Sequence, residues 1–180
     1  LKALNANTTA SHNNSFGFYV LLNNTTGDHN SAFGAKALQS NTTGDSNVAV
    51  GANALYSSTT ASYNVAIGVN ALYNNSNGYN NTAVGYYSLT SNVSGTNNVA
   101  LGFESGYSNN SGSSNVFIGY KAGYSETGSN TLYIANGTAN TNRLIYGDFE
   151  SGNMIIGNGT GTIDFSTSNV KNGNLRVNGR

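Results

Sequence analysis

A 17-residue repeat constrains the fold of this chain more than any other feature of its sequence. Residues 47–51 and 64–68 read Asn-Val-Ala-Val-Gly and Asn-Val-Ala-Ile-Gly, and their glycines are 17 positions apart. A chain with such a period is built from stacked copies of one structural unit. The same spacing extends in both directions and defines a glycine column, with an asparagine column four positions before it. The columns are Gly17, Gly34, Gly51, Gly68, Gly85, Gly102 and Gly119, and Asn13, Asn30, Asn47, Asn64, Asn81, Asn98 and Asn115.

The composition favours an ordered all-β protein. Of 180 residues, 33 are Asn, 23 are Gly and 12 are Tyr, and only 8% are charged, so the chain lacks the high charge of disordered proteins. Runs of strong helix formers are few, which argues against long helices. The seven basic residues are scattered and the net charge is zero, so we expect no nucleic-acid partner. No apolar run approaches the roughly 18 residues of a membrane span, so we expect no membrane insertion.

Three columns within each repeat predict a short strand. The residue before each glycine is large and apolar, and the residue three before it becomes apolar or β-branched, so we expect both columns to face the core of their own coil. The column between them is small and points to the opposite face, where a second backbone layer could approach closely. We therefore predict that this column faces a neighbouring chain. Its alanines are Ala32, Ala49, Ala66, Ala83 and Ala100.

A second apolar position follows four residues after each glycine, often with Tyr next, before a polar turn. We predict that each unit runs strand, glycine corner, second short strand and turn, because Asn, Ser and Gly are turn residues. Seventeen extended residues span roughly 55 Å, which suits one thin closed coil. The asparagine column is expected to form a ladder between coils, or alternatively to make local turn hydrogen bonds. The second apolar column is Leu21, Leu38, Leu55, Leu72 and Leu89, then Gly106 and Gly123.

A single stack of such coils is expected to be only marginally stable. Each coil offers three or four apolar side chains, and burying one contributes roughly 1.5–3 kcal/mol. Ordering each residue costs about 1–2 kcal/mol of backbone entropy. We therefore predict a homo-oligomer, most simply a closed ring of chains around the rod axis.

The motif at 64–68, with Asn-Ala-Leu-Tyr at 70–73, resembles the head repeats of YadA-type trimeric autotransporter adhesins and the longer repeats of phage and bacterial tail-fibre proteins. The resemblance implies a left-handed parallel β-roll assembled as a side-by-side or intertwined homotrimer. It also implies an extracellular location, on a virion tail fibre or a bacterial cell surface. The 17-residue period is longer than that of the adhesin heads.

The repeat register divides the chain into three predicted parts. We expect 1–12 to end a preceding segment, 13–128 to form a β-roll of seven repeats, and 129–180 to form a β-rich neck or connector. Short strand-like runs separated by Gly and Asn lie in this last part at 144–149, 154–157, 162–165 and 174–177. Because the sequence starts at Leu1 rather than Met, we interpret it as a piece of a longer protein.

Residues with chemical potential are few, and no catalytic, cofactor-binding or metal-binding group is predicted. Asp28 and Asp45, like His12 and His29, occupy one register position in adjacent coils, but no third ligand recurs beside them, so they are best interpreted as turn residues. Tyrosines could stack on the sugar rings of a surface glycan or pack on one another. The candidate glycan contacts are Tyr56, Tyr73, Tyr107 and Tyr124.

The leading functional prediction is a non-enzymatic structural and attachment segment, the shaft or head of a trimeric extracellular fibre. It would adhere to a host or environmental surface through a glycan or protein receptor. Two alternatives stay open. An ice-binding β-solenoid would need a flat, regular face, and a tailspike-like glycan-degrading enzyme would need a carboxylate pair in a groove.

Overall fold

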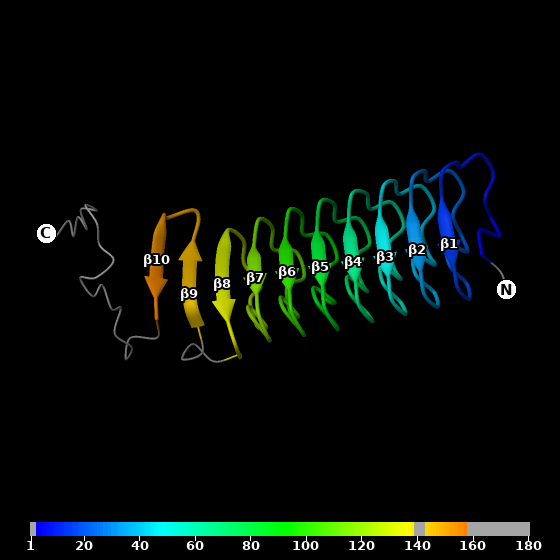
Figure 1. The fold of residues 1–180 in the computed structure, drawn as a ribbon. Coiled ribbons are helices and arrows are strands. Elements are labelled where there is room, and N and C mark those ends of the chain that lie inside the picture. The colour runs from blue at the N-terminus through cyan, green and yellow to red at the C-terminus, as the bar shows by residue number, and fades with distance from the viewer. Residues whose placement is uncertain (1–2, 139–142, 158–180) are drawn as a thin grey trace, which may run out of the picture.

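The computed structural model describes residues 3–138 and 143–157, and these form a rod of stacked coils (Figure 1). Ten strands make one sheet in which each strand pairs with the next along the chain. The part of the chain that the structure describes contains no helix. This confirms the predicted all-β parallel solenoid with 17-residue coils. The strands are β1 (Asn14–Phe16), β2 (Ser31–Phe33), β3 (Val48–Val50), β4 (Val65–Ile67), β5 (Thr82–Val84), β6 (Val99–Leu101), β7 (Val116–Ile118), β8 (Thr131–Ala135), β9 (Arg143–Asp148) and β10 (Asn153–Ile156).

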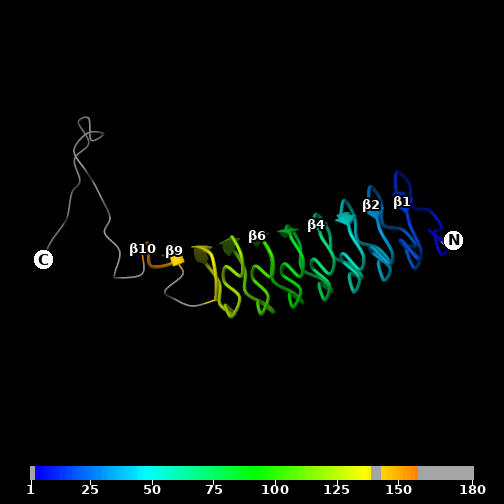
Figure 2. The ribbon, with the colours of Figure 1, turned by 60° about the horizontal axis from the view of Figure 1, so that its bottom comes forward.

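Each residue of a coil lies over the residue 17 positions later. In the β3–β4 pair, for example, Ala49 is in register with Ala66. The register continues outside the strands, where the backbone N–H of Thr42 donates to the Thr59 carbonyl oxygen at 2.9 Å. Figure 2 shows the resulting succession of narrow loops along the rod. Hydrogen bonding between coils therefore involves most of the coil, although each of the strands β1 to β7 is only three residues long.

The predicted second strand of each unit is wrong, because that segment is a series of turns. The residues two and four positions after the glycine have left-handed backbone, as at Lys36 (φ 61°) and Leu38 (φ 50°). Such residues cannot continue an extended strand. A bulky residue at positive φ is uncommon, yet all five leucines of this column adopt it, with φ between 46° and 53°. Tight closure of the coil requires this bend at the same point in every repeat.

The glycine column forms the predicted corner of each coil. Its φ values lie between 115° and 141°, which L-residues rarely adopt. A Cβ on Gly34 would also lie 2.6 Å from the carbonyl oxygen of Gly51 in the next coil. Glycine is therefore required by both backbone conformation and contact between coils.

The predicted orientation of the strand faces is wrong. The five alanines expected at a chain interface are completely buried inside their own coil: Ala32, Ala49, Ala66, Ala83 and Ala100. They pack in one core cluster with the buried leucines at the opposite wall of the coil. The interior is too thin for large side chains on both walls, so small residues on the strand face the leucines and the large apolar residues of the strand point outward.

In the last two coils of the array the sizes of these two columns change. Phe117 occupies the alanine position and is fully buried, while Gly106 and Gly123 occupy leucine positions. A Cβ on Gly106 would lie 2.6 Å from a ring carbon of Phe117, and one on Gly123 would also collide with the ring. The aromatic ring therefore fills the space that two missing leucines leave.

The end of the array departs from the 17-residue register but continues its sheet. β8 pairs in parallel with β7 at a 16-residue offset, with Leu132 opposite Val116. β9 and β10 then add antiparallel strands, which confirms the strand runs expected near 144–149 and 154–157. The runs at 162–165 and 174–177 lie outside the described residues. The left-handed winding implied by the resemblance stays a prediction.

Candidate functional site

An apolar surface, here called the outer stripe, runs along the outward face of β1–β7. It consists of the residues immediately before and immediately after each glycine, and Phe16, Ile67 and Tyr120 in it are 77%, 40% and 49% exposed. Since neighbouring strands lie about 4.8 Å apart, these side chains form a continuous band. Monomeric soluble proteins rarely expose apolar patches larger than a few hundred Å². The stripe contains Phe16, Phe33, Val50, Ile67, Val84, Leu101 and Ile118, and Phe18, Ala35, Ala52, Val69, Tyr86, Phe103 and Tyr120.

The C-terminal half of the outer stripe carries stacked aromatic rings. The ring centroids of Tyr86 and Phe103 are 5.3 Å apart, and those of Phe103 and Tyr120 are 5.4 Å apart. Lys121 lies beside them, with Nζ 5.5 Å from the Tyr120 centroid and 3.2 Å from a carboxylate oxygen of Glu104. Mutual packing holds these outward-facing rings in place.

The asparagine column forms the predicted ladder. Asn47 Nδ2 donates to Asn30 Oδ1 at 3.1 Å and to the Ala61 carbonyl oxygen at 2.8 Å, and the Asn47 backbone N–H donates to the same Asn30 oxygen at 3.0 Å. All three hydrogen bonds run between coils. The column is buried from Asn30 to Asn115, so its amides must be satisfied internally. Its role is to hold the corner of each coil.

A second asparagine ladder was not predicted from the sequence. It lies seven residues after each glycine, where Asn41 Nδ2 donates to Asn24 Oδ1 at 2.7 Å and to the Gly44 carbonyl oxygen at 3.0 Å. Reading the column seven places after each glycine would have revealed it in sequence. Its members are Asn24, Asn41, Asn75, Asn92 and Asn109, with Ser58 interrupting the series and Glu126 ending it.

The four tyrosines predicted as glycan contacts form two stacked pairs. The rings of Tyr56 and Tyr73 are 5.1 Å apart and tilted by 4°, and those of Tyr107 and Tyr124 are 4.9 Å apart and tilted by 10°. This confirms the alternative that the rings pack on one another. Within each pair one ring covers a face of the other, so glycan contact at these four residues stays a prediction.

The paired carboxylates accept hydrogen bonds from backbone N–H groups. Asp45 Oδ1 accepts a hydrogen bond from the Asp28 backbone N–H at 2.7 Å, and Asp28 Oδ1 accepts one from the Ser11 backbone N–H at 2.6 Å. These contacts confirm that the two residues act in turns. His12 and His29 stack with centroids 4.9 Å apart. Among the described residues, no three His, Cys, Asp or Glu side chains are grouped so as to bind a metal ion.

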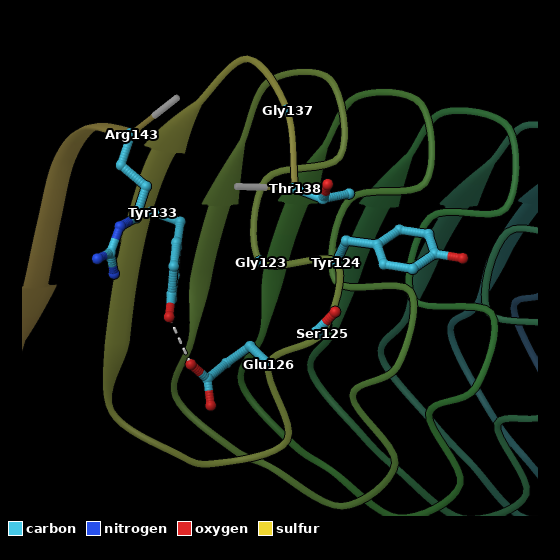
Figure 3. A pocket seen from close by; sticks show the side chains of 8 residues that line it. All are labelled: Gly123, Tyr124, Ser125, Glu126, Tyr133, Gly137, Thr138 and Arg143. Carbon is cyan, nitrogen blue, oxygen red and sulfur yellow. Dashed lines mark hydrogen bonds between the residues drawn. The ribbon is translucent and has the colours of Figure 1, made fainter. Parts of the chain in front are cut away.

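A small cavity of about 220 Å³ lies where the last coil meets β8 and β9 (Figure 3). In it Tyr133 donates to Glu126 Oε2 at 2.7 Å, while Glu126 Oε1 accepts the backbone N–H groups of Thr127 and Gly128. Burial, reinforced by this hydrogen bond, raises the pKa of Tyr133 above its usual range. The Arg143 guanidinium lies 5.6 Å from the centre of the Tyr133 ring. Both Glu126 oxygens accept hydrogen bonds, so the carboxylate joins the turn at Thr127 and Gly128 to Tyr133 of β8 at the end of the shortened 16-residue coil.

No family model, curated protein or solved structure matches this chain. Within residues 3–138 and 143–157, no helix has the length and apolar character needed to cross a bilayer.

Proposed function

We propose that this chain is a structural and attachment segment of a homotrimeric extracellular fibre, in a tail fibre or a surface adhesin. The outer stripe is the observation that carries the proposal. It extends over seven coils and points away from the core, so a single chain leaves it in water. Association through the stripe would cover it, in place of the alanine face expected from sequence.

The core inside each coil also favours association. In most coils it consists of one alanine and one leucine from the two facing columns, with a few flanking small residues. Such a core is thin for the 17 residues it orders. Burying the outer stripe between chains would add apolar contact to this thin core. The number three comes from the resemblance to trimeric fibres.

The last two strands support the same assembly. β9 and β10 extend the sheet beyond the closed coils, as Figure 1 shows, and β10 is exposed along its whole length. Leu144, Met154 and Ile155 are 61%, 62% and 53% exposed. Ile155 and its neighbour Met154 point to opposite faces of the strand, so apolar side chains emerge on both faces. Packing of this hairpin against the equivalent hairpins of other chains would cover them.

The assembly is tested by placing a charge in the stripe. We expect Ile67→Glu combined with Leu101→Glu to dissociate the trimer, because each carboxylate would be buried without a partner at the interface. Light scattering and native mass spectrometry measure the molecular mass. Asn70→Glu is the matched control, since its register position holds Glu104 two coils later. A wild-type monomer, or a double variant that remains trimeric, would overturn the proposed assembly.

The fibre role is tested by removing one whole coil. Deleting residues 64–80 joins Tyr63 to Asn81 and keeps every column in register. We expect a folded trimer shortened by about 4.8 Å, the spacing of one strand. Loss of folding or of assembly would count against an array of equivalent units. The ice-binding and tailspike-enzyme alternatives have no specific contact in their favour among the described residues.

A further inference from the structure

A shallow groove between two adjacent coils contains two tyrosines that differ from the others. It has a volume of about 550 Å³ and is lined by Thr60, Ser62, Tyr63, Asn77, Tyr79 and Asn80. Tyr63 and Tyr79 are 63% and 49% exposed. Each of the other ten tyrosines contacts at least one further aromatic ring, whereas Tyr63 and Tyr79 contact none among the described residues.

The register explains why these two rings are uncovered. Tyr63 lies between Ser46 and Asn80 in its column, and Tyr79 lies between Ser62 and Thr96 in the adjacent column. These small or polar neighbours cannot stack on a ring as Tyr56 stacks on Tyr73. The two tyrosines therefore lie diagonally across consecutive coils with aromatic surface open to solvent.

The backbone of the groove is held by hydrogen bonds between coils although it lies in turns. The Tyr63 backbone N–H donates to the Asp45 carbonyl oxygen at 3.0 Å, and the Tyr79 carbonyl oxygen accepts from the Asn97 N–H at 3.1 Å. The Asn80 N–H donates to the Ser62 carbonyl oxygen at 3.3 Å, which joins the two coils that form the groove. Because the backbone is already ordered, ligand binding would cost little backbone entropy.

We propose that this groove binds a pyranose unit of a neutral glycan. Tyrosine rings present flat apolar surface to the C–H face of a sugar, and the hydroxyl and amide groups of Thr60, Asn77 and Asn80 both donate and accept hydrogen bonds, as sugar hydroxyls require. None of the six lining residues is charged, which favours a neutral ligand over an acidic one. The groove is open along the surface, so it suits an internal unit of a polysaccharide. The inference deepens the attachment role and rests on it.

Isothermal titration of the assembled wild-type protein with maltoheptaose, chitohexaose and soluble galactomannan tests the proposal, with polygalacturonate as the acidic comparison. We expect one of the three neutral glycans to bind and the acidic one to bind more weakly. Tyr63→Ala and Tyr79→Ala should each weaken binding by about fivefold to tenfold, whereas Tyr63→Phe should retain most of it because the ring remains. His29→Ala is the matched control, because it removes a ring from the Tyr63 column two coils away and should leave affinity unchanged.

The outcomes distinguish the proposal of glycan binding in the groove from the proposal of a trimeric fibre. A wild-type trimer that binds none of the neutral glycans overturns the groove and leaves the assembly intact. A monomer whose glycan affinity depends on Tyr63 and Tyr79 supports the groove and overturns the assembly. Binding that is equally weakened by His29→Ala, or insensitive to both tyrosine variants, also overturns the assignment.

Discussion

Substituting two residues of one turn together should stabilise the array, although either substitution alone should destabilise it. The second asparagine ladder is interrupted at Ser58, and Asn41 Oδ1 and Ser58 Oγ are buried there without hydrogen-bond partners. The position three residues after each ladder asparagine is otherwise glycine, but after Ser58 it is Ala61. A Cβ on Gly27 would lie 2.7 Å from Asn24 Oδ1, and one on Gly44 would lie 2.5 Å from Asn41 Oδ1. A Cβ at the third following position would therefore collide with the ladder asparagine, and also with a carbonyl oxygen of the next coil, such as that of Ala61 at Gly44.

The magnitudes follow from these contacts. Ser58→Asn alone forces the carboxamide against the Ala61 methyl group and should cost about 1–3 kcal/mol. Ala61→Gly alone should cost about 0.5–1 kcal/mol through the unfolded chain. In the double variant the carboxamide can donate to Asn41 Oδ1 and accept from Asn75 Nδ2, and each hydrogen bond contributes about 0.5–1.5 kcal/mol. Satisfying the buried Asn41 oxygen adds to this, so we expect a coupling free energy of about 2 kcal/mol or more.

Urea unfolding followed by far-ultraviolet circular dichroism measures the free energy of unfolding of the four proteins of this cycle. All are compared at one protein concentration, because assembly shifts apparent stability. Additive effects, within about 0.5 kcal/mol, would refute the idea that the serine and the alanine compensate each other. A Ser58→Asn variant as stable as the wild type would refute the predicted clash.

Three further predictions follow from other contacts. Phe117→Ala should cost about 3–5 kcal/mol in unfolding free energy because it leaves a cavity in the core. Adding Gly106→Leu to this variant should restore part of the loss, whereas Gly106→Leu alone should destabilise the array. Gly68→Ala should cost on the order of 3 kcal/mol through its positive φ and its contact with the next coil, measured by the same unfolding assay. The pKa of Tyr133 is raised in the folded protein, so the contribution of this residue to stability is complete below about pH 10 and is lost as the pH rises further. Tyr133→Phe should therefore reduce the loss of stability between pH 8 and pH 11, measured by thermal melts. A loss as large as that of the wild type would contradict this prediction.

The repeat was predictable from sequence because backbone constraints recur in every copy. The positive φ and close contact at Gly34 exclude any side chain, and the buried carboxamide of Asn47 needs partners in two directions, so both residues repeat without exception. The period then gives the register of the sheet directly, as the pairing of Ala49 with Ala66 shows.

The direction of the strand faces was not predictable by the rule that large apolar residues point inward. That rule holds for thick cores, but in this coil Ala66 and Leu72 are buried together in a narrow core, and Ile67 is left outside. Both faces of each strand are apolar, so the pattern of alternate residues does not indicate which face is buried. The groove between Tyr63 and Tyr79 was equally hidden, since it depends on which rings the neighbouring coils leave uncovered.

The exchange of sizes around Phe117 has a consequence for how the array folds. Coils of almost identical sequence can pair with the wrong neighbour, skipping 17 residues and leaving a loop outside the stack. Phe117 fits only between coils that carry Gly106 and Gly123, because a leucine in either place would occupy the space of its ring. A chain that skipped the coil carrying Gly106 would bring Leu89 into that space. Phe117 therefore fixes which coils lie together near the C-terminal end of the stack. In the proposed trimer, this local register would help to align the ends of the three chains.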